Sequence, residues 1–150
     1  MNGFCKLAAA FAVVTTIGCA TQVTVTPTHR ENMAAQSKVL AIAARDLETV
    51  TRQRNAEGGG EEAVKAVIEF HAQAENFAGT VGEGRSDERI NTDYEHLIEA
   101  YVKLKQTFPN LNADKLTTDA YTRVQYEYEK LARTSGYANK AYQKKIEEGK

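Results

Sequence analysis

The chain is poor in the residue types that support several common protein classes. Its 150 residues include no tryptophan, two prolines and two cysteines. Two cysteines are too few for a disulfide framework, and sparse proline beside plentiful Ala, Glu, Lys and Gln favours helices. The 19 Lys and Arg nearly balance the 20 Asp and Glu, without a basic block. This charge balance argues against nucleic acid as a partner.

No apolar run is long enough to cross a membrane. The longest is Leu7–Ile17, whereas a transmembrane helix needs roughly 20 residues. Lys6 precedes this run and small residues follow it. A positive residue, a short apolar stretch and small residues in this order predict an export signal.

The end of this signal resembles the lipobox of bacterial lipoproteins. The residues are Thr16-Ile17-Gly18-Cys19, with Thr16 where that family usually has Leu. The resemblance implies removal of residues 1–18 and acylation of Cys19, with palmitate as the label to follow. Because Ala20 replaces Asp, it also implies the periplasmic face of the outer membrane. Cleavage after Ala20, leaving a free protein, stays open.

Removal of the signal leaves about 130 residues, the length of one domain. We predict a tether over residues 19–27 and a helical domain over residues 28–150. The alternating Val and Thr of the tether have no strand partner elsewhere, so an extended linker is expected. With Cys5 inside the signal, Cys19 would be the only remaining thiol, and acylation would account for it.

Two helices are expected in the first half. The first begins with Thr28-His29-Arg30-Glu31, a capping box, and ends before the glycines at 58–60. The second begins at Glu61 and Glu62, whose charges suit the positive end of the helix dipole. It ends in the glycine-rich segment 79–84. Apolar and neighbouring residues recur at helical spacing in both: Met33, Leu40, Ala43, Leu47, Val50, Val64, Val67, Ile68, His71, Ala74 and Ala78.

Two more helices are expected in the second half. Ser86 caps the third, which Pro109 terminates. Asn112 or Asp114 caps the fourth. Narrow apolar stripes and short connections predict an all-α, antiparallel up-down-up-down four-helix bundle. The two stripes are Ile90, Tyr94, Leu97, Tyr101, Leu104 and Phe108, then Tyr121, Val124, Tyr128, Leu131, Ser135, Ala138 and Tyr142.

The stretch 135–143, SGYANKAYQ, resembles the haem-attachment motif C-x-x-C-H-x-x-Y/F-R of cytochromes c-prime, which are periplasmic four-helix bundles. The resemblance puts Ser135 and Ala138 at the two cysteine positions, Asn139 at the axial histidine and Tyr142 at the aromatic position. Ser and Ala carry no thiol, and Asn is a very poor iron ligand. The resemblance therefore implies a cytochrome c-prime-like bundle without haem.

The volume of a lost haem must be filled or left as a pocket. An unfilled cavity costs about 24 cal/mol per Å³, which favours filling. We expect Phe70 and Phe77 to fill it together with tyrosines of the last helix. A residual pocket for a small apolar ligand would be lined by Arg30, Met33, Phe70, Phe77 and Tyr128. The tyrosines in question are Tyr121, Tyr126, Tyr128, Tyr137 and Tyr142.

Other chemistry has little support in the sequence. The last helix has no histidine for non-covalent haem, and the Glu-x-x-His pattern of di-iron bundles is not repeated. His71 is expected to be an interior histidine with Glu75 as its acceptor, while a metal site of His71, Glu75 and His96 is disfavoured. No catalytic triad or phosphate loop occurs. We therefore expect no metal, no cofactor and no enzyme.

The preferred interpretation is a non-catalytic cell-envelope lipoprotein with a binding or structural role. One alternative is a periplasmic haem-binding or electron-transfer protein. Another is a LemA-like helical envelope protein, because Phe108-Pro109-Asn110-Leu111 resembles the Tyr-Pro-Asp-Leu stretch of that family. The expected partner is the membrane, through the lipid anchor. The sequence leaves open a homodimer and a small apolar ligand.

Overall fold

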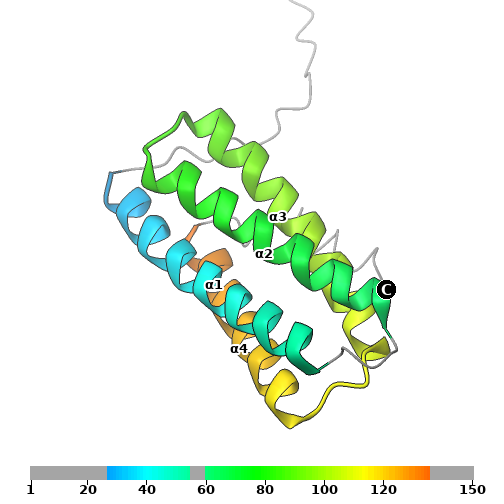
Figure 1. The fold of residues 1–150 in the computed structure, drawn as a ribbon. Coiled ribbons are helices and arrows are strands. Elements are labelled where there is room, and N and C mark those ends of the chain that lie inside the picture. The colour runs from blue at the N-terminus through cyan, green and yellow to red at the C-terminus, as the bar shows by residue number, and fades with distance from the viewer. Residues whose placement is uncertain (1–26, 55–59, 136–150) are drawn as a thin grey trace, which may run out of the picture.

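The described part of the chain is entirely helical. The computed structural model describes residues 27–54 and 60–135, and it contains no strand among them. The predicted all-α four-helix bundle is confirmed (Figure 1). Its elements are α1, Pro27–Arg54; α2, Glu61–Gly82; α3, Asp87–Thr107; the short 3₁₀ turn η1, Phe108–Asn110; and α4, Lys115–Thr134.

Successive helices run in opposite directions, but they do not pack equally closely. α1 lies against both α2 and α4, and α2 lies against α3 (Figure 1). In the described helices, no α-carbon of α3 comes within 8 Å of one of α4. The space between these two backbones is bridged by aromatic side chains.

Two predicted helix caps are confirmed. The Ser86 hydroxyl accepts the backbone N–H of Arg89 at 3.3 Å, at the start of α3. The Asp114 carboxylate accepts the backbone N–H of Thr117 at 2.9 Å, at the start of α4. This hydrogen bond lowers the pKa of Asp114 below its ordinary value. Each cap satisfies one of the amides that a helix start leaves without an intrahelical partner.

The predicted start of α1 is wrong, whereas the predicted end of α2 within residues 79–84 is confirmed. α1 already includes Pro27, so Thr28 lies inside the first turn and does not cap it. Proline is well accepted there because its missing N–H has no intrahelical partner at that position. α2 runs through Gly79 to Gly82, and the chain turns only at Gly84, where φ is +66°. Gly79 costs helix propensity, but the packed turns around it keep the helix intact.

Gly60 fixes how α2 begins. Its φ of +81° is in the left-handed region, which favours glycine. A Cβ at this position would lie 2.9 Å from Leu111 Cδ1. The start of α2 therefore packs directly against the connection between η1 and α4, where only a glycine fits without displacement.

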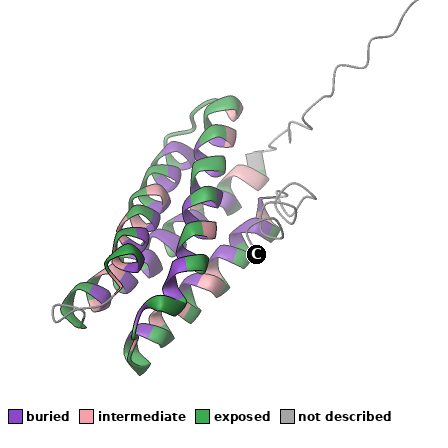
Figure 2. Cartoon of the chain, turned by 90° about the vertical axis from the view of Figure 1, so that its right-hand side faces the viewer, coloured by how far each residue is buried: buried purple, intermediate pink, exposed green. Residues whose placement is uncertain are grey.

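The core runs along the whole bundle and is made of the predicted stripes. Figure 2 shows the buried residues on the inward faces of the helices. Small residues are frequent among the buried positions of α1 and α2, and the buried rings of the α-helices come from α2 (Phe70 and Phe77), α3 (Tyr94 and Tyr101) and α4 (Tyr128). The buried alanines of the first two helices are Ala41, Ala43, Ala44, Ala63, Ala66, Ala74 and Ala78.

Candidate functional site

Three aromatic rings meet in the middle of the bundle. Tyr101 of α3 and Tyr128 of α4 stack at a centroid distance of 3.7 Å with an interplanar angle of 12°. Phe70 of α2 lies against both, at 5.8 Å and 6.3 Å. Phe70 and Tyr128 are fully buried, and Tyr101 nearly so. These rings span the wide α3–α4 seam.

Two further ring pairs lie nearer the ends of the bundle. Phe77 of α2 contacts Tyr94 of α3 at 5.3 Å. Phe108 of η1 stacks on Tyr121 of α4 at 3.8 Å, with an interplanar angle of 11°. Burial raises the pKa of the Tyr121 phenol, although a hydrogen bond with Gln125 opposes this effect. Aromatic side chains therefore occupy the interior along much of its length.

Only some of the tyrosines that were expected to fill the interior do so. Tyr128 is buried and Tyr121 is half-buried, but Tyr126 is 58% exposed, so its assignment was wrong. Tyr94 and Tyr101 of α3 take part instead. Their place in the predicted apolar stripe of that helix was the signal that could have identified them.

The residues expected to line a pocket do not form one group. Met33, Phe70, Phe77 and Tyr128 are each fully buried. The Arg30 side chain lies apart, on the surface. Its guanidinium donates to the Arg85 carbonyl at 2.9 Å and pairs with the Asp87 carboxylate, so it ties α1 to the start of α3. Its observed role is a surface contact between helices.

Only one of the residues that resemble the haem-attachment motif can be located. Ser135 is buried at the end of α4, and its hydroxyl donates to the Ala132 carbonyl at 3.1 Å. Ala138, Asn139 and Tyr142 lie outside the described residues, as does the lipidation residue Cys19.

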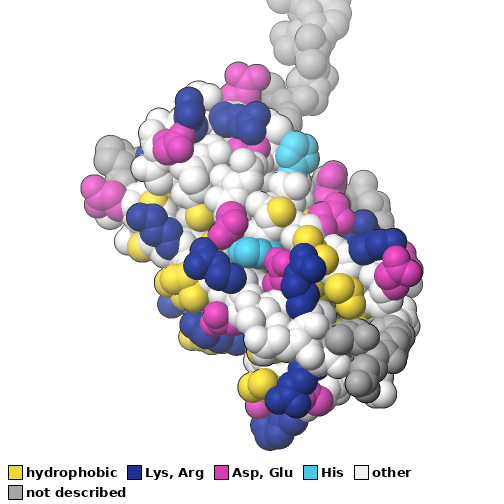
Figure 3. Space-filling model, viewed as in Figure 1, with side chains coloured by type: hydrophobic (Ala, Val, Ile, Leu, Met, Phe, Trp, Pro, Cys, Tyr) yellow, Lys and Arg dark blue, Asp and Glu magenta, His cyan; other side chains and the backbone are white. Residues whose placement is uncertain are grey.

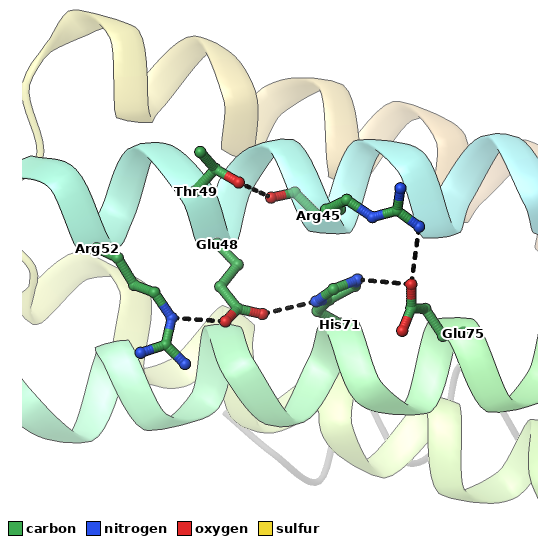
Figure 4. Close-up of polar contacts among 6 residues, drawn as sticks. All are labelled: Arg45, Glu48, Thr49, Arg52, His71 and Glu75. Atoms are coloured by element: carbon green, nitrogen blue, oxygen red, sulfur yellow. Dashed lines mark hydrogen bonds and ion pairs between the residues drawn. The ribbon is translucent and has the colours of Figure 1, made fainter.

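A chain of ion pairs joins the exposed side of α1 to α2 (Figure 4). His71 Nδ1 lies 2.6 Å from a carboxylate oxygen of Glu48, and Nε2 lies 3.2 Å from Glu75. Arg52 holds the other Glu48 oxygen at 2.6 Å, and Arg45 holds Glu75 at 2.8 Å. Of these two contacts, the one between Nδ1 and Glu48 has hydrogen-bond geometry, whereas the Nε2–Glu75 contact is an ion-pair distance.

The positive charges and hydrogen bonds in this network lower the pKa of both carboxylates, Glu48 and Glu75. Burial raises the pKa of Glu48, but the hydrogen bonds from His71 and Arg52 outweigh it, and the net pKa lies below the ordinary value. The pKa of Glu75 is lowered chiefly by Arg45 and further by His71. The sequence indicated the Glu75 contact. It did not indicate Glu48, Arg45 or Arg52, because their approach depends on how α1 and α2 are aligned.

A polar groove lies between α2 and α3, next to this network. Its volume is about 490 Å³. Beneath it the fully buried Asp93 accepts hydrogen bonds from Thr80 Oγ1 at 2.5 Å and Arg89 Nε at 2.9 Å. The residues that line the groove carry charges of both signs, and none of them has a large apolar side chain. Its lining residues are Glu75, Asn76, Gly79, Thr80, Glu83, Arg85 and Arg89.

The proposed ligands of a metal site do not converge. His96 is exposed on α3, whereas His71 and Glu75 face α1. In residues 27–54 and 60–135, no cluster of three or more His, Cys, Asp or Glu side chains could hold a metal ion. No helix of this part of the chain is long and apolar enough to cross a membrane.

Comparisons with known proteins do not assign the chain to a family. No family model, no curated protein and no solved structure matches it.

Proposed function

We propose that the protein is a non-catalytic lipoprotein of the bacterial cell envelope, anchored through Cys19, with a haem-less helical bundle that has a binding or structural role. The N-terminal signal supports the anchor. It combines a short apolar segment with a cysteine that would be the single thiol of the processed chain.

The packed aromatic interior is the observation that carries the haem-less part of the proposal. Tyr101, Tyr128 and Phe70 occupy the centre of the bundle, where a four-helix cytochrome needs space between its helices. Rings stacked at 3.7 Å leave no room between them for a planar prosthetic group. This packing supports a bundle that holds no haem.

Metabolic labelling with palmitate tests the anchor. We expect the wild-type chain to incorporate label and to fractionate with the outer membrane. A Cys19→Ala variant should incorporate none, and Cys5→Ala is the matched control because it alters the other cysteine but should label normally. Equal labelling of the wild type and Cys19→Ala would refute the anchor.

An absorption spectrum tests the absence of haem. The protein is expressed in a bacterium that attaches haem to c-type cytochromes, purified, and scanned for a Soret band. We expect a colourless protein. A stoichiometric Soret band that survives extraction with acidic acetone would show covalent haem and reject the proposal. A band removed by that extraction would show haem bound without a covalent bond, and it would favour the electron-transfer alternative.

A further inference from the structure

The exposed large apolar side chains are confined to two of the four helices. Val39 and Ile42 of α1 are 36% and 49% exposed, and Leu116 and Tyr126 of α4 are 48% and 58% exposed. Among the described residues, α2 and α3 carry none. Single exposed apolar residues need no explanation, but a one-sided distribution does.

The two exposed residues of α1 lie on the side of that helix that faces α4. On α1, the side chains of Gln36 and Asp46 bond to side chains of α4. Val39 follows Gln36 by three residues, and Ile42 precedes Asp46 by four. Residues three or four apart are neighbours on a helix surface, so both belong to the same edge of α1.

The two exposed residues of α4 lie on the facing edge. Arg123 of α4 contacts Asp46 at 2.9 Å, Tyr126 follows Arg123 by three residues, and Leu116 precedes it by seven, or two turns. Figure 3 shows apolar side chains along the left edge, over α1 and α4, as well as others further right on the same face. We call this surface the α1–α4 flank. Its apolar members are Val39, Ile42, Leu116 and Tyr126.

The length of the tether limits how far this flank can be from a membrane. Pro27, the first residue of α1, follows Cys19 by eight residues. At most roughly 3.3–3.6 Å per residue, the tether spans about 26–29 Å. α1 has 28 residues and is about 42 Å long, so Ile42 lies about 22 Å from its start. An anchored bundle lying on its side places the flank on the lipid surface within this reach.

Tethering also removes the need for a strong membrane affinity. Four partly exposed side chains would hold a free protein on lipid only weakly. A short linker converts docking into an intramolecular step at an effective concentration in the millimolar range, so weak affinity suffices. Tyr126 suits the interface because its ring is apolar and its hydroxyl polar, and the nearby Arg123 and Lys130 can extend to the headgroups.

We propose that the α1–α4 flank docks on the lipid surface to which Cys19 tethers the protein. The inference rests on the proposed lipoprotein function, because the anchor is what brings the flank to a membrane. In the docked state Val39, Ile42 and Tyr126 lie at the headgroup level, and the α2–α3 groove faces away from the membrane.

Because the chain contains no tryptophan, the fluorescence of a single introduced tryptophan reports only on that position. The chain from Cys19 to Lys150, with Tyr126→Trp as its single tryptophan, is coupled through its single thiol to a maleimide lipid. The vesicles contain phosphatidylethanolamine and phosphatidylglycerol, with and without brominated acyl chains. We expect the emission of the coupled protein to shift to the blue and to be quenched by the brominated lipid, and the uncoupled protein to show neither effect.

The matched reporter lies on the opposite flank. His96 is exposed on α3 and precedes Lys103 by seven residues, and Lys103 contacts Glu69 of α2 at 2.6 Å. A His96→Trp variant, coupled in the same way, should show neither shift nor quenching. Equal quenching of the two reporters would show that the bundle has no preferred orientation, and it would overturn the proposal.

A second variant tests whether the native side chains, rather than the new tryptophan, drive docking. Ile42→Glu in the Tyr126→Trp background should lose most of the quenching, whereas Ala72→Glu, at an exposed position of α2, should retain it. Quenching unchanged by Ile42→Glu would contradict the proposal. A blue shift that grows with protein concentration without vesicles would also contradict it, because a second copy would then cover the flank.

Chemical coupling makes a failure of the docking inference distinguishable from a failure of the proposed lipoprotein function. The vesicle experiment attaches lipid to Cys19 whether or not a cell does so, whereas palmitate labelling tests only the cell's modification. Failed labelling with successful docking would reject the anchor in the cell and leave the surface property intact. Successful labelling with failed docking would reject the flank alone.

Discussion

The α1–α2 half of the bundle and the α3–α4 half fill the space between their helices with different side chains. α1 and α2 bury many alanines and approach closely, and their outer edge is joined by the His71 network. α3 and α4 remain further apart, and stacked rings fill the seam between them. In the described bundle, the one neighbouring pair of helices without close backbone contacts is therefore also the pair whose rings stack face to face.

The comparison also predicts where stability is concentrated. A ring buried in the wide seam has no backbone behind it to close a gap, so its removal leaves a cavity. In the close α1–α2 seam, enlarging a buried side chain is destabilising, because an added methylene group has no space. The polar edge contributes less, because charges near solvent are partly screened. We therefore expect the largest loss of stability in the wide seam, a smaller one in the close seam and the smallest at the polar edge.

Removing the central ring should have the largest effect. Tyr128→Ala deletes a fully buried ring that stacks on Tyr101 and contacts Phe70, and we expect a loss of about 3–5 kcal/mol in the free energy of unfolding. Urea denaturation followed by circular dichroism measures it. Tyr126→Ala is the matched control, since it removes the same ring from an exposed position of the same helix.

That control sharpens the comparison, because surface substitutions usually change stability by less than about 0.5 kcal/mol. If Tyr126→Ala and Tyr128→Ala lost similar stability, the central stack would not be the support of the α3–α4 seam.

Enlarging a buried alanine in the close half should have an intermediate effect. Ala44 of α1 is fully buried, and Ala44→Leu should cost about 1–3 kcal/mol because the added atoms force helices apart or side chains out of their rotamers. Chemical denaturation measures it, with Ala35→Leu at an exposed position of α1 as the control. A neutral or stabilising Ala44→Leu would show an unfilled space in this seam.

Much of this fold follows from the sequence, and the parts that do not have identifiable physical reasons. Ser86, Asp114 and Pro109 mark helix ends through local chemistry, which a sequence displays directly. α2 ends within the predicted glycine-rich segment, at Gly82, but it continues through Gly79 because the local cost of that glycine is overridden by tertiary packing. The solvent-facing position of Tyr126 follows from its phase on α4, two residues from the buried Tyr128, which a list of tyrosines did not take into account.

The polar network around His71 was harder to predict from the sequence than the fold, because several of its contacts join two helices. His71 and Glu75 are one turn apart on α2, so their contact could be anticipated. Glu48 precedes His71 by 23 residues and meets it only after α1 and α2 have aligned. Contacts between helices depend on axial register, and periodicity within one helix carries no information about register.

Neutralising Glu48 should have the smallest effect of the three and the most informative pH dependence. Glu48→Gln removes a carboxylate that is 17% exposed and binds both His71 and Arg52, and we expect a loss of about 1 kcal/mol at about pH 7. Because folding lowers the pKa of Glu48 below 4.5, its stabilisation is fully present above that value. It is lost as the pH falls through the folded-state pKa, where the native carboxylate takes up a proton.

The stability difference between wild type and Glu48→Gln should therefore stay constant from about pH 7 to pH 5 and shrink below about pH 4.5. Denaturation curves recorded at a series of pH values measure this difference. Glu69→Gln serves as control, since its half-exposed pair with Lys103 on the α2–α3 side should contribute only a few tenths of a kcal/mol. If the stability difference caused by Glu48→Gln grew toward acid pH, burial would affect the pKa of this carboxylate more than His71 and Arg52 do. The polar contacts between α1 and α2 would then destabilise the bundle at neutral pH.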